Sequence, residues 1–104
     1  MKIGAYQLGN LLRNQIKFVY LDFRSPVGRA GYAGDPALLA GVKPAEAKAE
    51  LLANLAKDAP IVLLCDDGLA SAAEAEALEG VGFINVFVIE GGARGLGAVT
   101  DSEL

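Results

Sequence analysis

The chain contains a single cysteine, and the residues around it decide what chemistry a thiol could perform there. Residues 61–64 form an apolar run directly before Cys65, and Asp66, Asp67 and Gly68 follow it. We expect a strand to end at Cys65 and a helix to begin after a tight turn at Gly68. A thiol in such a turn faces unpaired backbone N–H groups and a helix N-terminus, which both favour the nucleophilic thiolate. Cys65 is therefore either a partly accessible nucleophile or a cysteine that only fills the core.

Residue types that the chain lacks exclude other kinds of site. The absence of histidine removes Ser-His and Cys-His catalytic pairs and imidazole metal ligands. Cysteine phosphatases share the strand-loop-helix arrangement, but they bind phosphate through an arginine at the position that Ser71 occupies here. A lone cysteine forms no internal disulfide, and we expect neither a metal site nor a cofactor.

Composition limits the size of the fold and the kinds of partner. A length of 104 residues suits one domain over 1–104, and an apolar content of 53% with mean hydropathy +0.37 predicts a folded core. The net charge is −4 and no Lys/Arg cluster is present, so nucleic acid and anionic membranes are not expected partners. The sequence shows no apolar run long enough for a bilayer span and no cleavable signal pattern. We expect a cytoplasmic protein with a reduced thiol.

The first half of the chain predicts a helix, a strand and a long connection. Leucines at helical spacing predict a helix over 5–14. Residues 17–23 are rich in aromatic and β-branched side chains, which are typical of a buried strand. Residues 24–43 are dense in Gly and Pro, so we expect an irregular connection with at most a brief strand at 37–39.

The second half continues the alternation of helices and strands. Pro44 suits the first position of a helix over 44–58. A capping box at 71–74 predicts the start of the next helix, which Gly80 ends, and residues 85–89 read as a buried strand. Strands that are apolar along their length and alternate with helices indicate an α/β domain, with helices on both faces of a mainly parallel sheet.

Sites in such sheets lie beyond the carboxyl ends of the strands. Asp22, Cys65 and residues 90–92 all follow predicted strands, so we expect them at one edge of the sheet. We expect Asp22 and Arg24 to bond each other, or the backbone, and so to brace the strand end. Tyr32 either lines the mouth of the site or packs beneath the long connection.

Three segments together resemble the rhodanese-like domain, the fold of the single-domain sulfurtransferases. Residues 20–26 (Tyr-Leu-Asp-Phe-Arg-Ser-Pro) are similar to a hydrophobic-Asp-x-Arg-Ser/Thr-Pro segment of that family. Residues 65–71 (Cys-Asp-Asp-Gly-Leu-Ala-Ser) resemble its C-x-x-G-x-x-S active-site loop. Residues 82–86 (Gly-Phe-Ile-Asn-Val), followed by Gly91-Gly92, resemble the close of the domain.

The chain departs from the family pattern in several places. Residues 31–34 (Gly-Tyr-Ala-Gly) replace a histidine-containing segment, and the family's tryptophan after the closing Gly-Gly is missing. We expect the terminal helix to be short or absent. Asp66 and Asp67 stand where such loops often carry a basic residue.

The resemblance implies a sulfurtransferase that moves a sulfane sulfur from a donor to a thiol or cyanide through a Cys65 persulfide. The donor would be a small molecule or a protein persulfide, and a protein acceptor is possible. The pocket would be formed by the loop amides and by residues at its rim: Asp66, Asp67, Gly68, Leu69, Ala70, Ser71, Asp22 and Arg24. The alternative is an inactive rhodanese-like module used for protein interaction or regulation. If the enzyme is active, Asp66 and Asp67 repel a dianion, which makes thiosulfate a poor donor.

Overall fold

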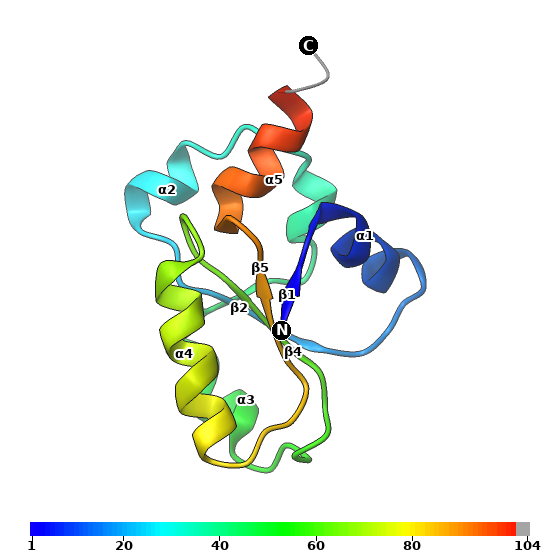
Figure 1. Ribbon diagram of the computed structural model, residues 1–104, viewed down its shortest axis with the longest axis vertical. Helices are drawn as coiled ribbons and strands as arrows, with labels where there is room; N and C mark the ends of the chain where they lie inside the picture. The colour runs from blue at the N-terminus through cyan, green and yellow to red at the C-terminus, as the bar shows by residue number, and fades with distance from the viewer. Residues whose placement is uncertain (102–104) are drawn as a thin grey trace.

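The computed structural model describes residues 1–101 and contains a five-stranded sheet in which all neighbouring strands are parallel. This confirms the predicted α/β class (Figure 1). Across the sheet the strands follow the order β1 (Lys2–Ile3), β5 (Val86–Ile89), β4 (Ile61–Leu64), β2 (Val19–Asp22) and β3 (Lys43–Pro44).

The central strand β4 is apolar throughout because both of its faces are buried. Val62 and Leu64 contact one core cluster, and Ile61 and Leu63 contact the other, as the alternation of a strand requires. Burial of each such side chain stabilises the fold by about 1.5–3 kcal/mol.

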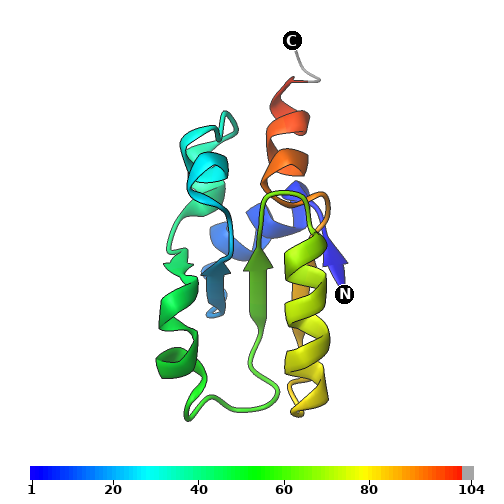
Figure 2. The same cartoon turned by 90° about the vertical axis from the view of Figure 1, so that its left-hand side faces the viewer.

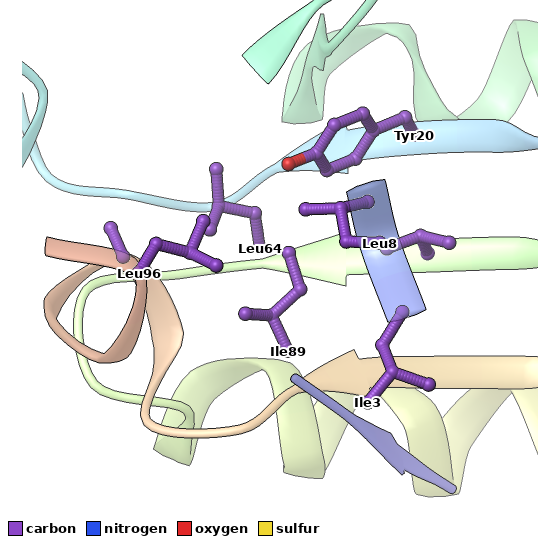
Figure 3. Close-up of a cluster of buried hydrophobic side chains, with 8 residues drawn as sticks. Ile3, Leu8, Tyr20, Leu64, Ile89 and Leu96 are labelled. Carbon is purple, nitrogen blue, oxygen red and sulfur yellow. The ribbon is translucent and has the colours of Figure 1, made fainter. Parts of the chain in front are cut away.

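Helices cover both faces of this sheet, as the sequence predicts (Figure 1). One face packs against α1 (Ala5–Arg13), the short 3-10 helix η1 (Pro36–Leu39) and α5 (Gly92–Asp101). Figure 3 shows part of this core, whose buried members are Ile3, Leu8, Tyr20, Val62, Leu64, Ile89, Ala93 and Leu96. The other face packs against α4 (Leu69–Gly80) and the segment that contains α3 (Lys48–Leu52). Within residues 1–101, no helix has the length and apolar character needed to cross a membrane.

The predicted connection over 24–43 holds more regular structure than we expected. It contains α2 (Pro26–Ala30), and residues 36–39 form η1 instead of the brief strand predicted at 37–39. Pro36 favours a helical turn, and the Asp35 carboxylate accepts a hydrogen bond from the Ala37 N–H at 2.9 Å. The predicted strand is therefore wrong, and the physical cause is a capped turn.

Three helices also differ from the prediction. Pro44 ends the edge strand β3, and the helical residues after it divide into η2 (Ala45–Ala47) and the five-residue α3. The helix α4 begins at Leu69, before the predicted capping box, because Gly68 makes the turn and its carbonyl accepts the Ala72 N–H at 3.1 Å. The terminal helix, expected to be short or absent, is the ten-residue α5.

Register places the candidate site at one edge of the sheet. Asp22 on β2 lies opposite Leu64 on β4, and the Phe23 N–H donates to the Leu64 carbonyl at 2.6 Å. Asp22 and Cys65 therefore lie at the carboxyl ends of neighbouring strands. Figure 2 shows α2, the turn after β4 and α5 gathered at this same end of the molecule.

Candidate active site

The Cys65 sulfur lies in a cradle of backbone amides at the start of α4. Its Sγ accepts hydrogen bonds from the Gly68 N–H at 3.0 Å and from the Ser71 N–H at 3.3 Å. Both donors belong to the N-terminal turn of a twelve-residue helix, whose dipole adds to their effect. An anionic sulfur is stabilised in such a setting. The expected arrangement of loop amides around Cys65 is therefore present at the two positions Gly68 and Ser71.

The turn that aims these amides requires glycine. Gly68 has φ +93°, in the left-handed region that side chains disfavour. Gly92 lies in the same region at φ +60°, and a Cβ there would also come within 2.4 Å of the Cys65 carbonyl oxygen. This close approach lets the Ala93 N–H donate to that carbonyl at 2.7 Å and the Arg94 N–H donate to the Asp66 carbonyl at 3.1 Å. The loop is thus fixed between β4 and the first turn of α5.

The prediction that Cys65 is partly accessible is wrong for this conformation, in which the residue is 1% exposed. The loop folds over its own sulfur, α5 binds the Cys65 and Asp66 carbonyls from one side, and α2 contacts the Asp66 side chain from another. Leu69 and Ala70, by contrast, are exposed at the beginning of α4. Their side chains therefore form the outer rim of the loop.

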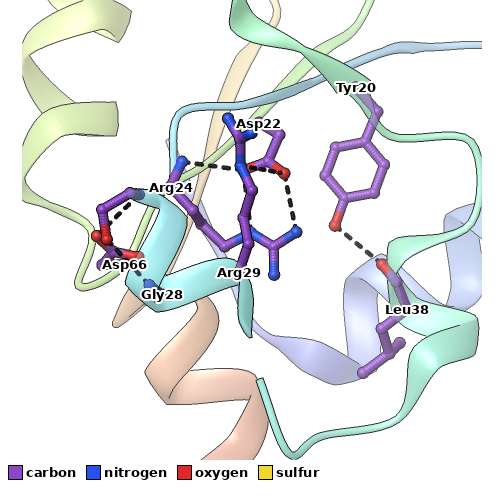
Figure 4. Close-up of polar contacts among 8 residues, drawn as sticks. Tyr20, Asp22, Arg24, Gly28, Arg29, Leu38 and Asp66 are labelled. Carbon is purple, nitrogen blue, oxygen red and sulfur yellow. Dashed lines mark hydrogen bonds and ion pairs between the residues drawn. The ribbon is translucent and has the colours of Figure 1, made fainter. Parts of the chain in front are cut away.

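Asp22 and Arg24 form a buried ion pair, which confirms the predicted brace at the end of β2 (Figure 4). The Arg24 Nε donates to Asp22 Oδ1 at 3.0 Å, Nη2 donates to Oδ2 at 2.8 Å, and the Arg24 N–H donates to Oδ1 at 2.9 Å. Arg29 Nε lies 3.6 Å from Asp22 Oδ2. Burial acts to raise the pKa of Asp22, but the hydrogen bonds and charge of Arg24, with a contribution from Arg29, hold that pKa below its ordinary value.

Two buried donors at the site have no hydrogen-bond partner among the described residues. They are Arg24 Nη1 and the hydroxyl of Ser71, whose residue is 0% exposed. Buried polar groups are nearly always paired in folded proteins. Each of these groups is able to donate to a sulfur or oxygen atom of a ligand.

The two aspartates of the loop do different things, although the sequence presents them as a pair. Asp66 Oδ2 accepts the Ser25 N–H at 3.1 Å, and Oδ1 is buried above Gly28 with no partner among the described residues (Figure 4). Asp67 is exposed, and its Oδ1 accepts the Leu69 N–H at 3.0 Å. Asp67 is a turn residue at the start of α4, whereas Asp66 joins the loop to α2.

Sequence reasoning missed α2 as a neighbour of the site. A signal was available, since Ser25-Pro26 is a typical helix start, and the Ser25 Oγ indeed accepts the Gly28 N–H at 3.0 Å. Tyr32, for which two positions were considered, packs against the core and donates its hydroxyl to the Asp35 carbonyl at 2.9 Å. Its ring also lies 5.9 Å from the guanidinium of Arg24.

Comparison with known proteins agrees with this geometry. A family model described as the rhodanese-like domain matches residues 12–98. Among solved structures, a rhodanese-like domain protein from Staphylococcus aureus is similar with a TM-score of 0.66 at 23% sequence identity, covering 91% of this chain and 89% of that one. A search of curated proteins gave no match. At this identity the solved structure supports the fold alone.

Proposed function

Because the chain belongs to the rhodanese-like domain family, we propose that it is a sulfurtransferase that carries a sulfane sulfur on Cys65. The observation that supports this most directly is the amide cradle, with Gly68 and Ser71 N–H groups at 3.0 and 3.3 Å from Sγ. A cysteine that only filled the core would need no such donors. They lower the cost of a charged sulfur, which both the nucleophile and the loaded intermediate require.

In the first step the Cys65 thiolate attacks the outer sulfur of the donor. A bond forms between Sγ and that sulfur while the bond from the outer sulfur to the rest of the donor breaks. The leaving group, a thiolate from a persulfide or sulfite from thiosulfate, takes the electron pair of the broken bond. Cys65 is left as a persulfide, and no external oxidant or reductant is consumed.

In the second step a thiolate or cyanide attacks the outer sulfur of the persulfide. The new bond forms on the acceptor, the Cys65 S–S bond breaks, and its electron pair returns to Sγ as the thiolate. The cradle thus meets a negative sulfur at the beginning and the end of each cycle, and the amides need no rearrangement between the two steps.

The same proposal covers the partners and the setting of the reaction. Suitable donors are small sulfane-sulfur compounds or a protein persulfide, and the acceptor is a small thiol, cyanide or a thiol on another protein. A chain whose only cysteine must stay reduced fits the cytoplasm, so we place the activity there.

Intact-mass measurement after incubation with a persulfide donor tests this function. We expect an added mass of one sulfur atom, removed again by cyanide, and no addition to a Cys65→Ser variant. Loading that persists in Cys65→Ser would contradict the assignment of the nucleophile.

A second candidate function is an inactive rhodanese-like module that binds another protein. The 1% exposure of Cys65 favours it, because a nucleophile sealed from solvent cannot reach a donor in this conformation. A folded protein that takes no sulfur from thiosulfate or from persulfide donors, even at long incubation, would select the module.

A further inference from the structure

Three helices surround the Cys65 loop, and they are attached to the fold very differently. The helix α4 buries Ser71, Ala75 and Leu78, and α5 buries Ala93 and Leu96. The five-residue α2 contains no buried side chain, and Val27, its second residue, is 82% exposed. Segments with few buried apolar contacts open at the lowest free-energy cost. Of the three helices around the loop, α2 is therefore the one that opens most easily.

A hydrogen bond and a close packing contact, both with Asp66 next to the nucleophile, hold α2 at the loop (Figure 4). The Ser25 N–H donates to Asp66 Oδ2 at 3.1 Å, and Asp66 Oδ1 lies so close to Gly28 that a Cβ there would be 1.7 Å from it. A weaker contact is the 3.6 Å ion pair between Arg29 and Asp22. The main attachment of α2 at the site is therefore the carboxylate of Asp66.

That attachment has a built-in opposing cost. Asp66 Oδ1 is buried and has no hydrogen-bond partner among the described residues. A buried acceptor without a partner destabilises the closed arrangement, because in an open arrangement the same oxygen would accept a hydrogen bond from water. At Asp66 the closed arrangement is thus stabilised by one hydrogen bond and weakened by an oxygen that lacks a partner among the described residues, and the 3.6 Å Arg29–Asp22 ion pair adds little, so the margin over an open arrangement is small.

We propose that α2 is a gate over Cys65 and that Asp66 is the positioning residue that holds it closed. This rests on the proposed sulfur transfer, for which a sulfur that is 1% exposed must become reachable. Movement of α2 away from Asp66 admits the donor and later the acceptor, while β4, α4 and α5 keep Sγ and its amide donors fixed.

Alkylation of native protein by iodoacetamide tests the gate without any sulfur donor. Cys65 is the only cysteine, so intact mass reports a single site. Asp66→Ala removes the acceptor for Ser25, and we expect alkylation to be about tenfold faster or more at fixed pH. Gly28→Ala disturbs the same contact between α2 and Asp66 from the α2 side, because the atom nearest to the added Cβ is Asp66 Oδ1. It should act in the same direction.

The double variant gives the sharpest result. If both substitutions open one contact, Gly28→Ala should add little to Asp66→Ala, a non-additivity that independent sites do not show. Asp67→Ala is the matched control, since it removes an equal charge one residue along the chain from a carboxylate that contacts α4 rather than α2. We expect it to change the alkylation rate by less than about twofold.

Hydrogen exchange separates opening of the gate from general unfolding. In Asp66→Ala the amides of Arg29 and Gly31, which bond within the α2 segment, should exchange faster while those of β4 do not. The gate is overturned if Asp66→Ala alkylates at the wild-type rate, if Asp67→Ala is accelerated equally, or if β4 exchanges as fast as α2. A protein that passes these tests but takes up no sulfur would refute the sulfurtransferase function and leave the gate standing.

Discussion

The loop after β4 and the helix α2 meet at Asp66, yet different contacts hold them. The loop is fixed by backbone hydrogen bonds to its sulfur from Gly68 and Ser71 and to its carbonyls from α5. The helix α2 is attached chiefly through one carboxylate and buries no side chain. Backbone contacts leave the Cys65 sulfur little freedom, whereas a single side chain attaches α2 to the loop only weakly. A rigidly held loop and a weakly attached helix thus meet at one residue, Asp66.

The largest effect should come from disturbing the rigid side at Gly92. A Cβ there would lie 2.4 Å from the Cys65 carbonyl oxygen, and the surrounding atoms are backbone, which cannot turn aside. We expect Gly92→Ala to lower the free energy of unfolding by about 2–4 kcal/mol, measured by urea denaturation. Gly80→Ala, where a Cβ meets nothing within 4 Å, is the control. Equal stability of the two variants would mean that α5 does not press on the loop.

The second-largest effect should come from the Asp22–Arg24 ion pair at the end of β2. Arg24→Ala leaves Asp22 buried without its bidentate partner, and we expect a loss of about 1–3 kcal/mol in the free energy of unfolding. Sulfur loading should fall only as far as folding does, which loading assays at several temperatures below the unfolding midpoint will check. A variant of full stability with no loading would place Arg24 in contact with the substrate through Nη1, which has no hydrogen-bond partner among the described residues.

The same pair predicts how stability depends on pH. The pKa of Asp22 is held below its ordinary value of 3.8 by Arg24, against the effect of burial. The unfolded chain therefore binds this proton first as the pH falls, so the stabilisation is fully present above about pH 5 and is lost as the pH drops through the folded pKa. Denaturation midpoints of the wild type and of Arg24→Ala should converge in acid. Parallel curves down to the lowest accessible pH would show that the pair does not account for acid sensitivity.

The smallest effect concerns the two aspartates and thiosulfate. A single carboxylate about 6 Å from a dianion lowers binding by up to about tenfold, and salt reduces this. We therefore expect Asp67→Asn to raise thiosulfate kcat/KM by less than about tenfold, with a smaller gain at high salt. Asp66→Asn also weakens the hold on α2, so it should raise kcat/KM for neutral persulfide donors too. Identical donor profiles of the two variants would indicate charge alone and count against the gate.

Most of the scaffold was predictable because buried strands and helices leave characteristic patterns of apolar residues in the sequence. The strands β2, β4 and β5 are apolar or aromatic runs bounded by turn residues, and the helix α4 ends at Gly80 as predicted. The pairing of Asp22 with Arg24 was predictable as well, since two residues of separation at a strand end bring such groups together. Local signals are sufficient where the determining contacts are local or follow from strand alternation.

The rest of the site depends on contacts between distant residues. Asp66 and Ser25 are separated by 41 positions, so no local pattern pairs them. The contacts of the loop with Ser25 before α2 and with the first turn of α5 likewise join residues that are far apart in the sequence. Gly28 and Gly92 read as ordinary turn glycines, although each allows a close approach that fixes this geometry. Such tertiary effects have no local pattern from which to predict them.

The amide cradle has a consequence for redesign. Because the groups that donate to Sγ are backbone N–H groups, these hydrogen bonds do not depend on which side chains stand at the loop's outer rim. Leu69 and Ala70 are exposed there, so a library of substitutions at these two positions would change the outer surface of the loop while the sulfur keeps its hydrogen bonds. The outer surface of the loop can therefore be redesigned separately from the backbone contacts that hold the sulfur.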